Sequence, residues 1–292
     1  MKILVFGKYL DSANLPYVKK VLDYLDQKTD YQVNDIFATE LMQHGTDISA
    51  SMIISNTDQL KAFAPDICIS MGGDGTILTA ATLIKDLAIP IVGINLGRLG
   101  FLASTEKAVL DKALDQLMSG EYNIEKRTML ALDSNISMFA NECFALNDFT
   151  LHKRDTSSMV TIHSYINGEF LNSYWADGII VSTPTGSTGY NLSCGGPIIY
   201  PDSQNFVITP VAPHNLNVRP LILSETSTIS FEIEGRSENF MCTLDSRYET
   251  VTAEHKLTIK KCDFQTHLIR LEDSSFLKTI RSKLAWGRDS RN

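Results

Sequence analysis

One short segment of the chain combines three glycines with a carboxylate and a hydroxyl. Residues 72–76 read GGDGT; they follow an apolar stretch at 66–71 that predicts a buried strand, and they precede a predicted helix starting near residue 77. Glycines in such a turn let the backbone approach an anion closely, and free N–H groups at a helix start favour phosphate. The sequence therefore predicts a phosphate-binding turn formed by Gly72, Gly73, Gly75 and Thr76, with Asp74 inside it.

The carboxylate of Asp74 would stand beside bound phosphates, which is unfavourable unless it serves a cation or accepts a proton. It can act as a general base toward an attacking hydroxyl, or bind Mg²⁺ directly or through water. The structural alternative is that Asp74 only caps the helix. The segment shows neither the lysine pattern of a P-loop nor G-x-G-x-x-G, which disfavours a P-loop ATPase and a simple hydride-transfer enzyme.

A second segment is a loop rich in small polar residues. Eight of the eleven residues at 183–193 (TPTGSTGYNLS) are Thr, Ser, Asn or Gly, so the loop offers many hydrogen-bonding groups to a polar ligand. Pro184 and Tyr190 favour ordered structure over the alternative of a flexible Ser/Gly linker. The loop lacks the G-x-S-x-G pattern of a serine hydrolase.

A third feature is the pair Asn147 and Asp148, which interrupts the apolar run at 144–151. Neighbouring strand residues point to opposite faces, so at least one of the two must be satisfied by a turn, a bulge or a ligand. A β-bulge with internal hydrogen bonds is the structural alternative, and it would be favoured if the pair stood alone.

The elements around these segments change character near Tyr122. Before it, apolar strands alternate with amphipathic helices, which predicts a parallel sheet with right-handed crossovers. Strands are expected at 2–7, 66–71 and 89–95, and helices at 15–25 and from a cap at Ser104 or Thr105 to Met118. After it, a period of two dominates, with a hairpin at 161–170 around Asn167-Gly168, further strands at 178–182, 227–233 and 256–260, and a final helix at 274–286.

The composition excludes several classes of protein. The 292 residues carry a net charge of -8, which disfavours sequence-independent binding to nucleic acid. No apolar run approaches the roughly 20 residues that span a bilayer, and the first apolar stretch is too short for a secretory signal. The five cysteines and six histidines show no metal-ligand or disulfide spacing. We therefore expect a cytoplasmic protein without nucleic-acid or membrane partners.

Taken together, these segments resemble the NAD kinase family, in particular the bacterial ATP-NAD kinases. GGDGT alone is shared in similar form with diacylglycerol and sphingosine kinases, whereas the long polar loop with Asn147-Asp148 upstream makes the resemblance specific. The resemblance runs through ISMGGDGTIL at 69–78, VGINLGRLGFL at 92–102, Asn147-Asp148, DGIIVSTPTGSTGYNLS at 177–193, GGPI at 195–198, PHNL at 213–216 and Arg219-Pro220.

The resemblance implies transfer of the γ-phosphoryl group of ATP to the 2′-hydroxyl of the adenosine ribose of NAD, giving NADP. Asp74 would accept the ribose hydroxyl proton or help to place it. A divalent metal, Mg²⁺ or Mn²⁺, would enter with ATP, and no direct protein ligand for it is assigned. The NAD-binding positions of the family fall on Asp74, Gly75, Asn147, Asp148, Asp177, Thr185, Thr188, Gly189, Tyr190, Asn191, Leu192 and Ser193.

The resemblance also implies the architecture: an N-terminal α/β domain with a parallel sheet, a central β-rich, β-sandwich-like domain, and a C-terminal segment that returns to the first domain. We assign residues 1–122 with 256–292 to the α/β domain that carries the phosphate turn, and 123–255 to the NAD-binding domain. Members of the family are homodimers or homotetramers, with sites at the domain boundary that a neighbouring subunit completes.

Three positions depart from the common family pattern. Gly189 stands in place of an alanine, Trp175 in place of a basic residue, and Arg247 in place of a glutamine. The departures concern contacts to the nicotinamide half of the substrate, and the family pattern assigns no role to Trp175 or Arg247.

Two other functions share the phosphate turn: a lipid kinase of the diacylglycerol kinase type, and a non-catalytic NAD or nucleotide sensor. The polar loop favours a nucleotide over an acyl chain, and the intact Asp74 favours catalysis. The sequence leaves open whether polyphosphate replaces ATP, whether NADH is accepted and which products inhibit.

Overall fold

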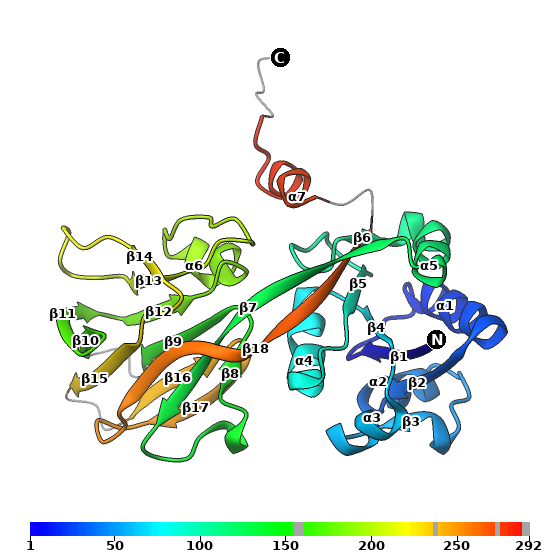
Figure 1. The fold of residues 1–292 in the computed structure, drawn as a ribbon, viewed down its shortest axis with the longest axis horizontal. Helices are drawn as coiled ribbons and strands as arrows, with labels where there is room; N and C mark the ends of the chain where they lie inside the picture. Colours follow the sequence, from blue (N-terminus) through cyan, green and yellow to red (C-terminus); the bar gives the residue numbers. More distant parts are fainter. Residues whose placement is uncertain (155–159, 236–238, 272–274, 288–292) are drawn as a thin grey trace. The chain divides into compact units, whose positions relative to one another are not determined.

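The computed structural model describes residues 1–154, 160–235, 239–271 and 275–287. The chain forms two compact units, Met1–Lys126 with Thr266–Asn292, and Arg127–Gln265 (Figure 1). It passes from one to the other within two strands, β7 (Tyr122–Ser134) and β18 (Leu257–Leu271). Tyr122, where the sequence pattern changes, is the first residue of β7. Residues from Thr266 onward belong to the first unit, whereas the sequence assignment placed the return at residue 256.

The first unit contains a parallel sheet in the order β18-β5-β4-β1-β2-β3, with the short β6 paired to β5. Its strands are β1 (Lys2–Gly7), β2 (Asp30–Asn34), β3 (Ile53–Ile54), β4 (Ile67–Met71), β5 (Ile91–Asn95) and β6 (Thr105–Glu106), and its α-helices are α1 (Leu15–Lys28), α2 (Asp35–Gln43), α3 (Thr57–Phe63), α4 (Asp74–Ile84), α5 (Leu110–Ser119) and α7 (Phe276–Lys283). The predicted parallel α/β arrangement is confirmed.

The helix expected from Ser104 or Thr105 begins later than the sequence suggested. Thr105 lies in β6, a 3-10 turn follows at Lys107–Val109, and α5 starts only at Leu110. Threonine is a good cap but also a good strand residue, and pairing of Ile94 with Thr105 favours the strand.

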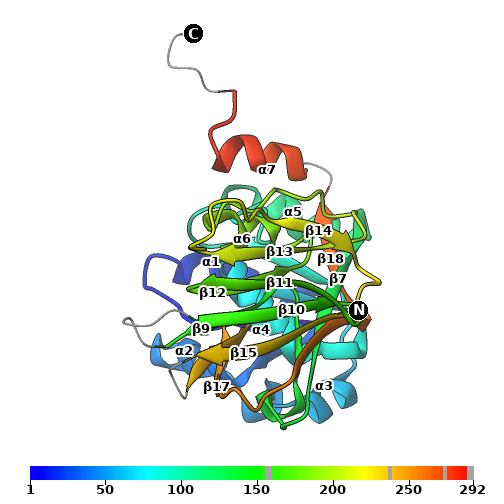
Figure 2. The ribbon, with the colours of Figure 1, turned by 90° about the vertical axis from the view of Figure 1, so that its left-hand side faces the viewer.

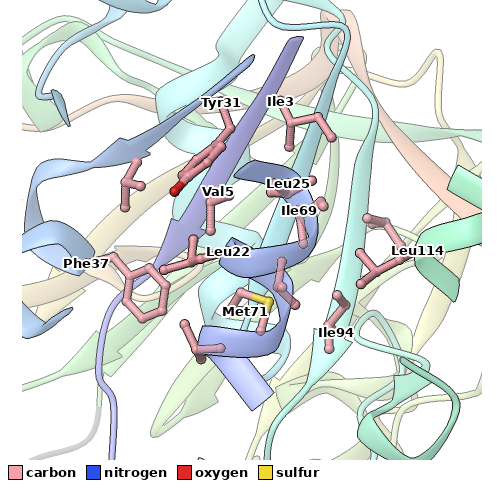
Figure 3. Close-up of a cluster of buried hydrophobic side chains, with 14 of the residues drawn as sticks. Ile3, Val5, Leu22, Leu25, Tyr31, Phe37, Ile69, Met71, Ile94 and Leu114 are labelled. Atoms are coloured by element: carbon pink, nitrogen blue, oxygen red, sulfur yellow. The ribbon is translucent and has the colours of Figure 1, made fainter. Parts of the chain in front are cut away.

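The core of the first unit lies where α1, α2 and α5 cover one face of this sheet. Leu22 and Leu25 of α1 pack in one apolar cluster with Val5, Ile69 and other strand residues (Figure 3). Every residue of β4 and of β5 is buried, as expected for central parallel strands with both faces covered. The end of β4, which carries the GGDGT turn, is therefore fixed by the best-packed part of the unit.

The second unit is built from two sheets around one apolar core. One sheet has the order β14-β13-β12-β9-β16-β17 with antiparallel pairs, and part of this order can be followed in Figure 2. The other contains β11-β10-β15 and the first part of β18, with β7 and β8. Phe149 and Phe231 come from different sheets and stack with ring centroids 5.8 Å apart, so the β-sandwich-like prediction is confirmed.

The strands of the second unit are β8 (Phe144–Ala145), β9 (Asp148–Lys153), β10 (Val160–Ile166), β11 (Glu169–Ala176), β12 (Gly178–Ser182), β13 (Asn205–Val211), β14 (Leu221–Ser224), β15 (Ile229–Gly235), β16 (Phe240–Leu244) and β17 (Arg247–Val251), together with the parts of β7 and β18 in this unit; its one described α-helix is α6 (Tyr190–Ser193). The predicted hairpin is confirmed: β10 and β11 meet at Asn167 and Gly168, which both have positive φ. None of the described helices combines the length and apolar character needed to cross a bilayer.

Gly93 of β5 allows α4 to pack close to the sheet. A Cβ atom on Gly93 would lie 2.5 Å from Cδ1 of Ile77 on α4 and 2.7 Å from the Cα of Ala103. We predict that Gly93→Ala lowers the free energy of unfolding by about 1–3 kcal/mol, because the Ala103 Cα can move away only if the backbone shifts. Urea unfolding followed by circular dichroism measures this change.

Gly97→Ala is the matched control, since the nearest atom to a Cβ there is 4.0 Å away. It should change the unfolding free energy by less than about 0.5 kcal/mol. Equal stability of the two variants would show that α4 does not depend on the close approach at Gly93.

Candidate active site

The GGDGT turn connects β4 to α4. A Cβ atom on Gly72 would lie 2.3 Å from Oγ1 of Thr76, so the turn needs glycine there. At Gly73 and Gly75 a Cβ would meet nothing within 4 Å, so these two glycines keep space open beside the backbone. Gly73 is the N-cap of α4 and no side chain caps the helix. The N–H of Thr76 donates to the Gly73 carbonyl at 3.0 Å, and the N–H groups of Asp74 and Gly75 remain for an external acceptor such as a phosphate.

Asp74 is the first residue of α4, and its carboxylate faces a neighbouring loop. Oδ2 accepts a hydrogen bond from the N–H of Phe101 at 2.8 Å, and Oδ1 accepts from Leu102 at 3.0 Å and Ala103 at 2.9 Å. The capping alternative is therefore wrong, because the cap is Gly73 and the carboxylate bonds elsewhere. A carboxylate has about four acceptor positions, so three filled by the backbone leave one for another donor.

Gly100 and Arg270 shape the loop that holds Asp74. A Cβ atom on Gly100 would lie 1.8 Å from Oδ1 of Asp74, so only glycine lets the carboxylate reach the loop. The buried Arg270 donates to Ser104 Oγ at 2.6 Å and to the Phe101 carbonyl at 3.3 Å, and it pairs with Glu125 at 3.0 Å. The sequence did not predict that Gly100 and Arg270 shape the loop that holds Asp74, although the glycine in the LGFL segment could have indicated a close approach there.

In the second unit, Asn147 precedes β9 and Asp148 begins it. Asp148 pairs in register with Ser182 of β12, so the pair does not form the bulge that was the alternative. Oδ1 of Asn147 is buried without a hydrogen-bond partner among the described residues. Asp148 is 6% exposed, and burial, followed by the charge of Asp245, raises its pKa to about 8. Asn147 therefore presents an unsatisfied acceptor, and Asp148 presents a buried carboxyl group whose charged form is disfavoured.

The loop at 183–193 is ordered by its own hydroxyl and amide groups. Thr183 Oγ1 donates to the Leu146 carbonyl and accepts from the N–H of Gly186. Ser187 Oγ donates to Pro184 and accepts from the N–H of Ile199. The flexible-linker alternative is therefore wrong, and a short 3-10 turn at Gly186–Thr188 leads directly into α6.

Asn191 is used within this loop. Its Nδ2 donates to the carbonyls of Ser187 and Pro197, and its Oδ1 accepts from Thr209 Oγ1 at 2.6 Å. A Cβ atom on Gly196 would lie 1.9 Å from that same Oδ1. The side chain of Asn191 therefore stabilises the loop, and any contact of this residue with a ligand would come from its backbone.

Several predicted site residues of the second unit do come together. A Cβ on Gly189 would be 3.7 Å from both Nδ2 of Asn147 and Oδ2 of Asp148, so the loop passes over the polar pair. Tyr190 is 41% exposed, its ring centroid lies 5.5 Å from that of His152, and burial raises its pKa, with smaller contributions from Cys194 and Asp148. The structure thus forms a small polar face from these residues.

The remaining predicted residues of the loop and β12 lie around this face. Thr185 is buried and accepts a hydrogen bond from Thr188, and Leu192 and Ser193 continue α6. Asp177 forms an ion pair with Lys153 at 2.5 Å. Arg247 lies on β17 and bonds backbone carbonyls.

Family models match most of the chain. The ATP-NAD kinase N-terminal domain matches residues 8–122, and the ATP-NAD kinase C-terminal domain matches residues 146–271. The NAD kinase of Cytophaga hutchinsonii is 50% identical over the full length of both chains, and that of Flavobacterium psychrophilum is 45% identical, again over the full length of both.

Solved structures with the same fold support the architecture alone, since their identities are low. Yeast NADH kinase complexed with NADH has a TM-score of 0.86 at 23% identity, covering 99% of this chain and 89% of that one. An NAD kinase from Archaeoglobus fulgidus in complex with ATP has a TM-score of 0.74 at 24% identity, covering 98% of each chain. From the two family models and the full-length relatives, the chain belongs to the ATP-NAD kinase family, the phosphotransferases that make NADP from NAD.

Proposed function

We propose that Asp74 is the proton acceptor of the NAD kinase reaction in this protein. The observation that carries the proposal is the carboxylate held by three backbone N–H groups with one acceptor position left. The 2′-hydroxyl oxygen of the adenosine ribose forms a bond to the γ-phosphorus as its proton passes to Asp74. The bond between that phosphorus and the β–γ bridging oxygen breaks, and ADP leaves.

The glycine turn binds phosphate in this proposal. Phosphoryl transfer depends mainly on positioning and on neutralising charge. The uncapped first turn of α4 supplies N–H groups, and the open space beside Gly73 and Gly75 lets phosphate oxygens approach them. The family models offer no support for the lipid kinase or sensor alternatives.

The polar face of the second unit holds the adenosine of NAD. The unpartnered Oδ1 of Asn147 suits the amino group of adenine, since a buried acceptor without a donor costs about 1–3 kcal/mol. The Asp148 carboxylate suits the other hydroxyl of this ribose as a hydrogen-bond donor, which leaves the 2′-hydroxyl proton for Asp74. Backbone groups of residues 188–193 and the ring of Tyr190 would enclose the nucleoside. Asp177 would contribute to the site across a subunit boundary of a homodimer or homotetramer, as the family resemblance implies.

A divalent metal fits as a companion of ATP. The described residues hold no cluster of three or more His, Cys, Asp or Glu side chains suited to an ion, and the Asp74 carboxylate is largely taken by backbone N–H groups. Mg²⁺ commonly binds through substrate phosphates and few protein ligands. When bound, the metal would neutralise charge on the phosphates. The five cysteines are all free, which agrees with the cytoplasmic location that we propose.

The role of Asp74 is tested by Asp74→Asn and Gly100→Ala. Asp74→Asn should lower kcat by about 10²–10⁴-fold because the base is lost. Gly100→Ala keeps the carboxylate but puts a Cβ within 1.8 Å of it, and displacement of that size should cost about 10²-fold in kcat. A coupled dehydrogenase assay for NADP measures both rates.

Gly97→Ala, in the same loop with open space around it, should keep the wild-type kcat. If Asp74→Asn turned over at the wild-type rate, the assignment of the base would be wrong.

The role of Asp148 is tested by the pH dependence of NAD binding. An ionised Asp148 accepts a ribose hydroxyl more strongly than a protonated one, and its raised pKa of about 8 means that it is protonated at lower pH. The Kd for NAD, measured by titration calorimetry without ATP, should therefore fall by up to about tenfold per pH unit as the pH rises to about 8, and level off above it. The nearby Tyr190 and Cys194 have pKa values that are themselves raised, so they stay protonated in this range.

Asp148→Asn should bind NAD more weakly above pH 8 and show a flat pH profile. A wild-type profile that is equally flat would exclude Asp148 as the titrating group.

The metal is tested by chelation. EDTA should abolish NADP formation, and either Mg²⁺ or Mn²⁺ in excess should restore it, because the anionic substrates need charge neutralisation that an acidic protein does not supply through its net charge. NAD binding in the absence of ATP should be unchanged by EDTA. Full activity in excess EDTA would contradict the proposed metal requirement.

A further inference from the structure

The turn between β16 and β17 is hydrogen-bonded to the segment that contains Asn147 and Asp148. Oδ2 of Asp245 accepts from the N–H of Leu146 at 2.9 Å, and Oδ1 accepts from Asn147 at 2.7 Å and from Asp148 at 3.2 Å. In return, the N–H of Asp245 donates to the Asp148 carbonyl at 3.0 Å. Asp245 has a φ of 54°, a left-handed conformation that a tight turn requires.

Arg247, at the other side of the same turn, holds the preceding residues. Its Nη1 donates to the Glu142 carbonyl at 2.6 Å, and its Nη2 donates to the Phe144 carbonyl. The guanidinium also lies over the rings of Phe139 and Phe144, with centroids 5.8 and 5.2 Å away. One side chain of the turn therefore binds carbonyls, and the other binds amides, of a single stretch at 142–148.

The carbonyls of Leu146 and Asn147 accept hydrogen bonds from Oγ1 and the N–H of Thr183, whereas the N–H groups of residues 146–148 donate to Asp245. β8 comprises only Phe144–Ala145, and Leu146 and Asn147 belong to no strand. Consecutive backbone N–H groups all need acceptors when they are buried, and a strand edge offers an acceptor only at alternate residues. Asp245 supplies both oxygens for this purpose. The pairing of Leu244 with Phe149 keeps the turn in register with β9.

The same turn also acts on Asp148 electrostatically. Burial raises the pKa of Asp148 first, and the negative charge of Asp245 raises it further. The other titratable groups that face Asp148 are Tyr190 and Cys194. Burial also raises the pKa of Asp245, against the opposing effect of its three N–H bonds and of Arg247.

We propose that Asp245 and Arg247 are positioning residues for NAD, and that the β16–β17 turn fixes the polar pair without either side chain contacting the substrate. The inference rests on the proposed function, since it takes Asn147 and Asp148 as NAD-binding groups. In this proposal Arg247 acts by hydrogen-bonding the backbone carbonyls of Glu142 and Phe144. The turn thereby fixes the place of the Asp148 carboxylate, and the charge of Asp245 adds to the rise in pKa that burial causes.

Asp245→Asn tests the two effects separately. At pH 9.5, where Asp148 is ionised in both proteins, the Kd for NAD should rise about tenfold to a hundredfold, because the pair loses its anchor. The midpoint of the pH profile of NAD binding should fall by about one unit, because the neighbouring negative charge is gone. Amide hydrogen exchange at residues 146–148 should become faster than in the wild type. If Asp245 only stabilised the fold, the midpoint of the pH profile of NAD binding would not shift.

Arg247→Lys and Ser246→Ala complete the set. Arg247→Lys keeps the charge but not the two-pronged contact, so the Kd for NAD should rise about threefold to tenfold, with an unshifted midpoint. Ser246→Ala, an exposed residue in the same turn, should match the wild type in both measurements.

The outcomes distinguish this inference from the proposed function. If Asp148→Asn binds NAD with wild-type affinity and pH profile, the proposed function of the pair fails. If Asp148→Asn weakens binding, while Asp245→Asn keeps the wild-type Kd, midpoint and exchange rates, the positioning role is overturned. Should Asp245→Asn not fold, Arg247→Lys decides alone: unchanged NAD binding and unchanged exchange at residues 142–148 would overturn it.

Discussion

A carboxylate that accepts hydrogen bonds from three consecutive backbone N–H groups appears in each unit of the described chain. In the first unit, Asp74 accepts from residues 101–103. In the second, Asp245 accepts from residues 146–148. In both cases Oδ2 takes the first N–H and Oδ1 takes the next two. Such bonds to an ionised acceptor are about twice as strong as neutral ones, so each fixes a side chain and a backbone segment together.

The two arrangements have opposite consequences. At Asp74, the backbone holds the carboxylate that we propose takes part in the reaction. At Asp245, the carboxylate holds the backbone that presents Asn147 and Asp148. In both arrangements the donors to the carboxylate are backbone N–H groups and not cationic side chains. This is compatible with a protein that has a net charge of -8 and binds two anionic substrates. Backbone N–H groups supply positive potential locally, whatever the overall charge.

The sequence predicted the parts of the site whose chemistry lies in side chains or in glycines. The GGDGT turn is found at the end of β4, and residues 183–193 form an ordered loop close to Asn147 and Asp148. The backbone donors at 101–103 could not be predicted, because any residue type can supply an N–H. Gly100 is the one part of this arrangement that the sequence could reveal, because a Cβ atom at that position would clash with the Asp74 carboxylate. The internal use of Asn191 was hidden because two of its partners are backbone carbonyls, which any residue type supplies, and the third, Thr209, lies on another strand. The change of pattern near Tyr122 indicates the first passage between the units, but no linker marks either passage because β7 and β18 continue through them.

A crystal structure of the protein with NAD and a non-hydrolysable ATP analogue tests the central claim about Asp74 most directly. The measured quantity is the distance from the Asp74 carboxylate to the 2′-oxygen of the adenosine ribose. The account predicts about 2.6–3.2 Å, with the hydrogen bonds from Phe101, Leu102 and Ala103 retained. An Asp74 that keeps those three bonds while no ribose hydroxyl lies within reach of it would contradict the account.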